Sequence, residues 1–267
     1  MSDDAVALRA KMYGEDDLSS LPVFAGGFIN FGYWRDIPID GEITVDQRVD
    51  SQLALYRLVM DKLGVGPADA VVEIGSGTGV GAAWAVAEVG PREWHGVDLS
   101  PDQVRRASAH ATDRLAFHQG AATAIPFPDD GFDVALSLEA AQHMDDIAGF
   151  AAEASRVLRP GGRFAVCTFF APDADHPGEL ARRLETFAAG VDRDHAVPAV
   201  VSALTAAGFA GVDVTAIGEH VWAGLDRWLV QLGVPDDEWP RRWLTCYRDG
   251  LIDYYLISAT VPSAASR

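Results

Sequence analysis

The chain has 267 residues, of which 49% are apolar, and this is enough to form the core of one large domain or of two small ones. Its 21 Lys and Arg residues stand against 39 Asp and Glu residues, so the formal net charge is −18. A surface of this charge repels phosphate backbones and anionic lipids, and we therefore expect neither a nucleic-acid nor a membrane partner.

The rare residue types exclude further classes of protein. Lys11 and Lys62 are the only lysines, and neither lies in a P-loop, in the Tyr-x-x-x-Lys motif of short-chain dehydrogenases or in a setting typical of a Schiff base. Two cysteines and seven scattered histidines indicate neither a disulfide framework nor a metal site. The sequence contains no apolar run of 18 residues, and its acidic start lacks the apolar region of a secretory signal. We expect a cytoplasmic protein without a metal.

Helices and short apolar strands alternate along most of the chain. The expected order is a helix at 46–63, a strand at 70–74, a helix at 80–89, a strand at 94–99, a helix at 101–111, strands at 115–119 and 132–138, a helix at 146–158 and a strand at 163–170. Helices at 178–189 and 196–207 and strands at 211–217 and 251–261 follow. Continuous apolar strands between helices indicate a mostly parallel sheet that is covered on both faces.

The remaining segments are expected to cover this core. We expect an N-terminal arm or lid at 1–45 and a single domain at 46–267, with covers inserted at about 171–194 and 222–249. The second cover contains four of the seven tryptophans, which could pack its helices together or form a wall of a substrate site. Segments 10–34 and 222–249 are predicted to close over a site and exclude water.

The strongest local motif is a strand that runs into alternating glycines and then into a helix. The strand at 70–74 is followed by Gly75, Gly77 and Gly79. Glycine lets a ligand approach the backbone closely, and the N-terminus of the next helix favours a carboxylate or a phosphate. Glu73, two residues before the first glycine, suits an ammonium group better than a pyrophosphate. The motif therefore favours a zwitterionic amino acid.

A second carboxylate, Asp98, ends the next expected strand, where it can accept both hydroxyls of a ribose. Each carboxylate also has a simpler explanation, because Glu73 could be a polar residue at a strand end and Asp98 could help to cap the helix after Ser100. The stretch 77–82 also fits Gly-x-Gly-x-x-Ala, which leaves a dinucleotide site open. Taken together, the loop and the two carboxylates favour an adenosyl amino acid.

From here the sequence resembles the class I S-adenosylmethionine-dependent methyltransferases, and more narrowly the small-molecule methyltransferases of bacterial natural-product pathways. The resemblance covers about residues 24–170. Its motifs are Phe31-Gly32-Tyr33-Trp34, the glycine loop, Asp98, Ile125-Pro126-Phe127-Pro128-Asp129, Phe132-Asp133-Val134, Leu138-Glu139-Ala140-Ala141-Gln142-His143 and Leu158-Arg159-Pro160-Gly161-Gly162. The resemblance implies an α/β, Rossmann-like, doubly wound seven-stranded sheet, mostly parallel with an antiparallel last strand, plus helical covers.

The resemblance also implies a cofactor, S-adenosylmethionine, with S-adenosylhomocysteine as product. The residues expected to bind it are Tyr33, Glu73, Gly75, Ser76, Gly77, Asp98, Leu99, Ala122 and Glu139. Glu73 and the loop backbone would hold the methionine part, Asp98 the ribose and Leu99 one face of the adenine. The family often has Asp after the third strand, whereas this chain has Gly120-Ala121-Ala122, so the adenine would depend on backbone near Ala122. Tyr33 could instead belong to a hydrophobic lid.

The implied reaction is methyl transfer to an O, N or C nucleophile of a small organic acceptor in secondary metabolism. The same fold also resembles proteins that bind the cofactor but steer a cyclisation, and C-methylation of an alkene could trigger ring closure, with Glu139 or His143 steadying the cation. A nicotinamide oxidoreductase fits poorly, because Glu73 is ill placed and Tyr-x-x-x-Lys is missing. A binding module without activity does not explain the ordered motifs. A homo-oligomer stays open.

His143 follows the strand at 132–138, at the sheet edge where ligands of open α/β folds bind. Family members often use a histidine here as a general base, sometimes steadied by an acid at the end of the fifth strand. This chain has Thr168 and Phe169 there, so the imidazole would act with a hydroxyl, with water or alone. Its other explanation is a histidine that caps or packs the following helix. We predict that His143 is the catalytic base.

Overall fold

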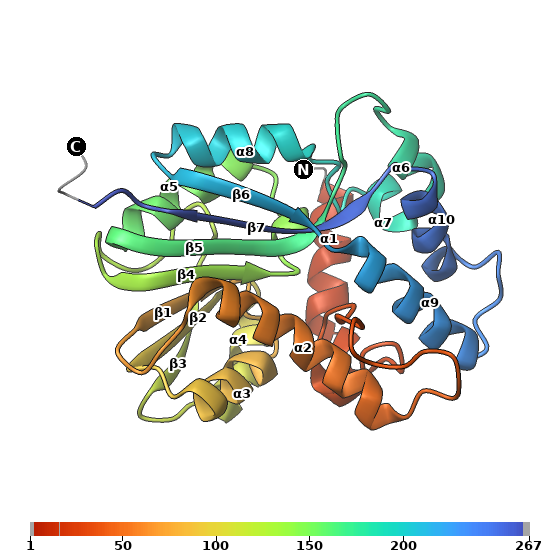
Figure 1. The fold of residues 1–267 in the computed structure, drawn as a ribbon, viewed down its shortest axis with the longest axis horizontal. Helices are drawn as coiled ribbons and strands as arrows, with labels where there is room; N and C mark the ends of the chain where they lie inside the picture. Colours follow the sequence, from red (N-terminus) through yellow and green to blue (C-terminus); the bar gives the residue numbers. More distant parts are fainter. Residues whose placement is uncertain (1–2, 16, 264–267) are drawn as a thin grey trace.

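A seven-stranded sheet forms the centre of the computed structural model, which describes residues 3–15 and 17–263 (Figure 1). The strands are β1 (Ala70–Ile74), β2 (Glu93–Asp98), β3 (Leu115–Gln119), β4 (Phe132–Leu138), β5 (Leu158–Phe170), β6 (Ala210–Ala216) and β7 (Asp253–Thr260). Their spatial order is β3-β2-β1-β4-β5-β7-β6. β7 is antiparallel to both of its neighbours and the other neighbouring pairs are parallel, which confirms the predicted fold class.

Helices cover both faces of this sheet. On one face lie α2 (Val45–Leu63), α3 (Val80–Val89) and α4 (Pro101–Ala107), and on the other lie α5 (Ile147–Val157) and α8 (Val197–Ala206) (Figure 1). Successive side chains of a strand point to opposite faces, so Val71 joins the core beneath α2 and α3 while Val72 joins the core beneath α5 and α8. None of the helices that the structure describes is long and apolar enough to span a bilayer.

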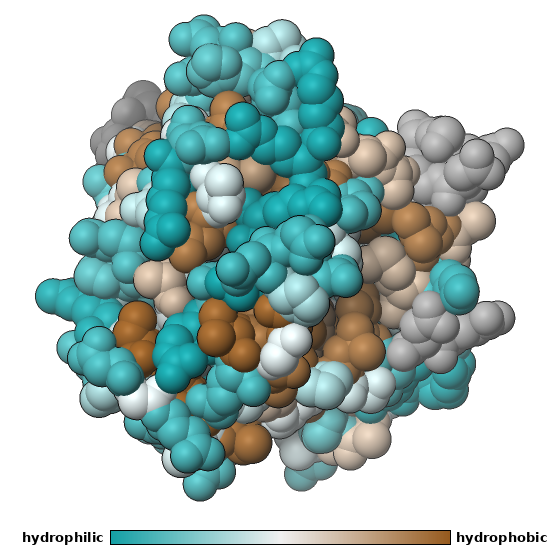
Figure 2. Space-filling model, turned by 90° about the vertical axis from the view of Figure 1, so that its right-hand side faces the viewer, coloured by the Kyte–Doolittle hydropathy of each residue, from teal (hydrophilic) through white to brown (hydrophobic). Residues whose placement is uncertain are grey.

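The remaining helices gather at one end of the sheet, beyond the carboxyl ends of β4 and β5 (Figure 1). They are α1 (Asp3–Ala10), α6 (Glu179–Arg183), α7 (Glu185–Ala188), α9 (Trp222–Gln231) and α10 (Arg242–Arg248), with a π-helical turn η1 (Lys11–Glu15) after α1. Short 3-10 turns join them: η2 (Leu18–Ser20), η3 (Ala25–Gly27), η6 (Gly218–His220) and η7 (Trp239–Arg241). Hydrophilic residues form most of the surface at this end, with hydrophobic residues in groups between them (Figure 2).

Most predicted boundaries lie within two residues of those in the structure, and three elements differ more. The helix predicted at 178–189 is two short helices, because buried Leu184 between them has an extended backbone (φ −123, ψ 122). The helix predicted at 101–111 ends as α4 at Ala107 and continues as a 3-10 turn, η4 (Ser108–His110). β5 begins at Leu158 rather than 163, because Leu158 already pairs with Phe132 before the Pro-Gly-Gly turn.

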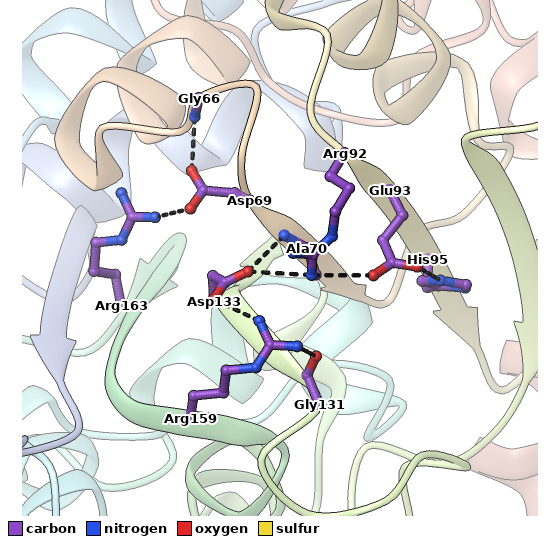
Figure 3. Close-up of polar contacts among 10 residues, drawn as sticks. All are labelled: Gly66, Asp69, Ala70, Arg92, Glu93, His95, Gly131, Asp133, Arg159 and Arg163. Carbon is purple, nitrogen blue, oxygen red and sulfur yellow. Dashed lines mark hydrogen bonds and ion pairs between the residues drawn. The ribbon is translucent and has the colours of Figure 1, made fainter. Parts of the chain in front are cut away.

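Ion pairs tie the amino ends of the parallel strands together (Figure 3). Asp133 at the start of β4 accepts hydrogen bonds from the N–H of Ala70 at 2.8 Å and from Arg159 Nη1 at 2.6 Å, and lies 3.5 Å from Arg92. Although burial opposes it, these donors lower the pKa of Asp133. Asp133 therefore joins β1 to β4 and to the start of β5, at the edge opposite the carboxyl ends.

We expect Asp133→Ala to lower the free energy of unfolding by about 1–3 kcal/mol, because Ala70 and Arg159 lose a shared acceptor. Urea denaturation followed by circular dichroism measures this loss. The matched control is Asp113→Ala, which removes an exposed carboxylate and should change stability by less than about 0.5 kcal/mol. Equal effects of the two variants would contradict the structural role of Asp133.

Candidate functional site

A cavity of 590 Å³ lies at the carboxyl ends of β1, β2 and β4. The strand order reverses between β1 and β4, and such a switch point is where open α/β sheets bind ligands. Eight of the predicted site residues line this cavity: Gly75, Ser76, Gly77, Asp98, Leu99, Ala122, Glu139 and His143. The fold therefore brings residues that follow four strands, β1, β2, β3 and β4, to one place.

The glycine loop forms one wall of the cavity. Gly75 has a φ of 83°, and a Cβ atom there would collide with the Cβ of Ala140 from the segment after β4. Gly77 has a φ of 53°, but a Cβ there would meet no protein atom within 4 Å. Gly75 is thus needed for packing, whereas Gly77 leaves open space beside the loop, where a ligand can approach the backbone.

Asp98 is bonded directly to that loop. Its Oδ2 accepts the N–H of Gly77 at 2.9 Å, and its Oδ1 accepts the N–H of Ser100 at 2.9 Å. Burial raises the pKa of Asp98, and these two backbone bonds partly oppose the rise. Each carboxylate oxygen keeps a further acceptor site. The side chain of Leu99, 59% exposed, and Ala122 provide apolar surface in the same part of the cavity.

Glu73 is not part of the cavity wall, which corrects the expected direct contact with a ligand ammonium group. Its side chain is fully buried, with Oε1 accepting the Tyr56 hydroxyl at 2.9 Å and Oε2 accepting Trp94 Nε1–H at 3.1 Å. The alternation of β1 turns Glu73 with Val71 toward α2 and α3, away from the cavity. Tyr56 does line the cavity, so the hydrogen bond to Tyr56 links Glu73 to it.

Burial raises the pKa of Glu73 to about 7, against an ordinary value of 4.5. A raised folded-state pKa gives stability that is complete below about pH 4.5 and is lost as the pH rises through about 7. We therefore expect the free energy of unfolding to fall by about 1–3 kcal/mol between about pH 5 and pH 8. Urea denaturation at several pH values measures this slope.

Glu73→Gln is the matched variant for this pH dependence. A Gln amide can still accept from Trp94 and can donate to the oxygen of Tyr56, but it does not ionise. Burial also raises the pKa of Glu139 to about 7, so the variant should reduce the slope rather than abolish it. An unchanged slope in Glu73→Gln would show that Glu73 does not titrate in this range.

Tyr33 and the tryptophans of the second cover also lie outside the cavity wall. The ring of Tyr33 is buried and stands edge-on to His220, with 5.4 Å between the ring centroids, because its backbone N–H is held by Ser51. Tyr33 therefore does not line the cavity in which a cofactor contact was expected of it. Trp222 and Trp243 stack on each other at 5.6 Å and are buried, so they pack the cover helices and do not form a substrate wall.

His143 has an acidic partner that the sequence did not indicate. It ends the 3-10 turn η5 (Ala141–His143) directly after β4, and its Nδ1 lies 2.8 Å from Oδ1 of buried Asp192 and 3.2 Å from the carbonyl oxygen of Val191. Asp192 follows α7 in the first cover. The expectation that His143 acts with a hydroxyl, with water or alone did not include a carboxylate, and the structure places Asp192 on the Nδ1 side of the ring.

The other ring nitrogen of His143 faces the N-terminal segment. Nε2 lies 2.7 Å from the hydroxyl of Tyr13, which lines the cavity. Arg9 lines the cavity too and donates to the carbonyl of Val191 at 2.8 Å. α1 therefore contacts the chain beside Asp192, and η1 contacts Nε2 of His143. Tyr13 is the only aromatic residue before Phe24, and this could have marked it in the sequence as a candidate site residue. Nothing in the sequence distinguishes Asp192 from Asp194 as a partner of His143.

Glu139 forms the wall between these groups. It has a left-handed backbone (φ 46), which is uncommon for a residue with a side chain. Its Oε1 accepts the N–H of Phe31 at 2.6 Å and the hydroxyl of Tyr254 at 2.7 Å. A buried guanidinium, Arg48, donates to the carbonyls of Val23, Asn30 and Phe31 on the same segment. Through its hydrogen bond with Phe31, Glu139 holds the segment after η3 beside the cavity.

Comparisons with known proteins agree with this arrangement. A family model described as "Methyltransferase domain" matches residues 72–166. The erythromycin 3''-O-methyltransferase of Saccharopolyspora erythraea is 34% identical over 223 residues, which cover 78% of this chain and 70% of that protein. Several other curated relatives match over about half of their own length.

Solved structures show the same fold at low sequence identity. Geranyl diphosphate C-methyltransferase from Streptomyces coelicolor, solved with S-adenosyl-L-homocysteine, has a TM-score of 0.82 at 18% identity and covers 97% of this chain and 99% of its own. The [4+2]-cyclase SpnF has a TM-score of 0.76 at 21% identity, with 96% and 97% covered. The fold alone therefore does not separate methyl transfer from cyclisation.

Proposed function

Since this chain belongs to the class I S-adenosylmethionine-dependent methyltransferases of natural-product type, we propose that it methylates a hydroxyl oxygen of a small organic acceptor in secondary metabolism, with His143 as the general base. The observation that supports this choice is the His143–Asp192 pair, whose histidine lines the same cavity as the glycine loop. A hydroxyl is the nucleophile that most needs a base, because it attacks poorly while protonated.

The cavity fits the adenosyl cofactor at the glycine-loop end. Open space beside Gly77 leaves room for the methionine part, and Asp98 has free acceptor sites for the ribose hydroxyls. Leu99 and Ala122 would pack against the adenine. When bound, S-adenosylmethionine supplies an electrophilic methyl group on its sulfonium. Tyr56, rather than Glu73, is the residue placed to meet the methionine end.

His143 and Asp192 would handle the proton. The acceptor hydroxyl would give its proton to Nε2 of His143 as its oxygen becomes methylated. The carbonyl of Val191, 3.2 Å from Nδ1, would hold the ring, and the carboxylate of Asp192, 2.8 Å from Nδ1, would stabilise the imidazolium by its charge. The hydroxyl of Tyr13, 2.7 Å from Nε2, marks where an acceptor hydroxyl would have to bind. Binding of the acceptor therefore requires the Tyr13 side chain to turn aside, while the backbone of η1 can stay over the cavity.

We expect η1 to gain protection from hydrogen exchange when S-adenosylhomocysteine and an acceptor are added, because it carries Tyr13 over the cavity. α9 is the internal control: it does not contribute to the cavity wall, so its protection should not change. Exchange measured by mass spectrometry resolves the two segments. Protection of both segments would support the expectation that 10–34 and 222–249 close over the site, and protection of α9 alone would contradict the role given to η1.

A second candidate is C-methylation of an alkene, with or without ring closure. It is favoured by Glu139, whose carboxylate lines the cavity and whose pKa burial raises to about 7. A carboxylate in this position could steady a cation or remove the last proton. In this reaction His143 is not required as a base for a hydroxyl.

Incubation with isotopically labelled S-adenosylmethionine and matched acceptors that differ only in a hydroxyl, an amine or an alkene separates these reactions. Methyl transfer to the hydroxyl acceptor, with one S-adenosylhomocysteine formed per product, supports the proposal. Transfer only to amines or alkenes would overturn it. Product formed without consumption of the cofactor would identify a cyclase.

A further inference from the structure

The side chain of Gln142 lies against the proposed base and is itself held on two sides. It is buried, and its Nε2 donates to the carbonyl oxygen of Glu139 at 2.9 Å. Its Oε1 accepts the hydroxyl of buried Thr168 at 2.6 Å. A flipped amide would place Oε1 against the Glu139 carbonyl, two acceptors in contact, so the orientation of the amide is fixed.

This fixed amide determines what Nε2 of His143 meets. The second N–H of the Gln142 amide points to Nε2 at 3.2 Å, and the Tyr13 hydroxyl lies 2.7 Å from the same nitrogen. Nδ1, in contrast, faces two acceptors, Asp192 Oδ1 at 2.8 Å and the carbonyl of Val191 at 3.2 Å. The ring proton therefore belongs on Nδ1, and the lone pair belongs on Nε2.

We propose that Gln142, anchored by Thr168, is a positioning residue that keeps the lone pair of His143 on Nε2, the ring nitrogen that faces the cavity. The proposal rests on the proposed function, in which Nε2 takes the proton of the acceptor. A proton on Nε2 would face the donor N–H of Gln142, and a hydrogen bond to the neutral form disfavours the charged form.

Charged and titratable groups surround the ring. Asp192 and Tyr13 contact it, Arg9, Asp98, Glu139, Asp145 and Asp146 line the same cavity, and Arg193 pairs with Asp145. Among them Gln142 is an uncharged donor. Thr168 serves to orient its amide.

Long-range ¹H–¹⁵N spectra of the full chain labelled with [¹⁵N]histidine, with S-adenosylhomocysteine bound, test this directly. The signal of His143 is identified by its loss in His143→Asn. We expect the Nδ1–H tautomer at about pH 8, above the ordinary titration range of histidine. His195 is the internal control, because its Nε2 lies 2.7 Å from the carbonyl of Met144 and should carry the proton.

Two substitutions at Gln142 measure its effect on protonation. Gln142→Glu should raise the pH midpoint of imidazolium formation at His143 by about one unit or more, because a donor becomes a carboxylate. Gln142→Met, which removes the donor without adding a charge, should raise it less and is the second variant if the first does not fold. Thr168→Val should shift the midpoint upward, whereas Thr168→Ser should not.

An Nε2–H tautomer in the wild-type protein, or unchanged midpoints in both Gln142 variants, would overturn the proposal. These spectra require neither an acceptor nor turnover, so they remain informative if hydroxyl methylation fails. In that case the Nδ1–H tautomer and the shifted midpoints would show that Gln142 positions the ring, and only the assigned reaction would be lost.

Discussion

His143→Ala should lower kcat by about 10²–10⁴-fold, the usual effect of removing a general base, while cofactor affinity stays nearly unchanged. The reason is geometric: Nε2 faces the cavity, whereas the loop and Asp98 that would bind the cofactor come from β1 and β2. Steady-state kinetics with a hydroxyl acceptor gives kcat, and calorimetry with S-adenosylhomocysteine gives the affinity.

Two further variants test the partner of His143 and provide a control for the loss of a histidine. Asp192→Asn keeps the shape of the partner but removes its charge, so kcat should fall less than in His143→Ala. His110→Ala changes an exposed histidine of η4 and should leave kcat unaltered. If His143→Ala retains turnover within about tenfold, the acceptor needs no base, as expected for an amine or an alkene.

Asp98→Ala should weaken S-adenosylhomocysteine binding by about tenfold or more, because a charge-assisted hydrogen bond contributes about 1.5–3 kcal/mol and two ribose hydroxyls lose their acceptor. The substitution also frees the N–H groups of Gly77 and Ser100, which Asp98 now holds. Titration calorimetry on the folded variant gives the dissociation constant.

Asp98→Asn is the matched control for this second effect. Its one carbonyl oxygen can still accept, so the affinity should lie between those of the wild-type protein and Asp98→Ala. Circular dichroism shows whether both variants keep the fold. Unchanged affinity in folded Asp98→Ala would remove the ribose assignment.

The sheet could be predicted from the sequence because its signals are local. Short apolar strands, the glycine loop and the turn at Pro160-Gly161-Gly162 each report on their own segment, and the strand ends then bring Asp98 and His143 together. The orientation of Glu73 could not be predicted in the same way. All five residues of β1 are buried, so the strand shows no alternation from which its two faces could be told apart.

Asp192 could not be predicted because its position depends on the fold of a cover. Buried Leu184 breaks the predicted helix, and the chain then turns so that Val191 and Asp192 reach His143. No local pattern encodes this contact between distant segments. The tryptophans were ambiguous for a related reason: their composition indicates burial, but not whether protein or ligand buries them.

The location of Asp192 has a consequence for recombination between enzymes of this type. Covers such as 171–194 are natural units to exchange when new acceptors are sought, since they lie outside the regular alternation of strands and helices. A chimera that receives this segment from another methyltransferase would keep the glycine loop and Asp98 but lose the carboxylate beside His143. Such a hybrid would still take up its cofactor and yet turn over slowly, unless the donor segment places an acid at the same point.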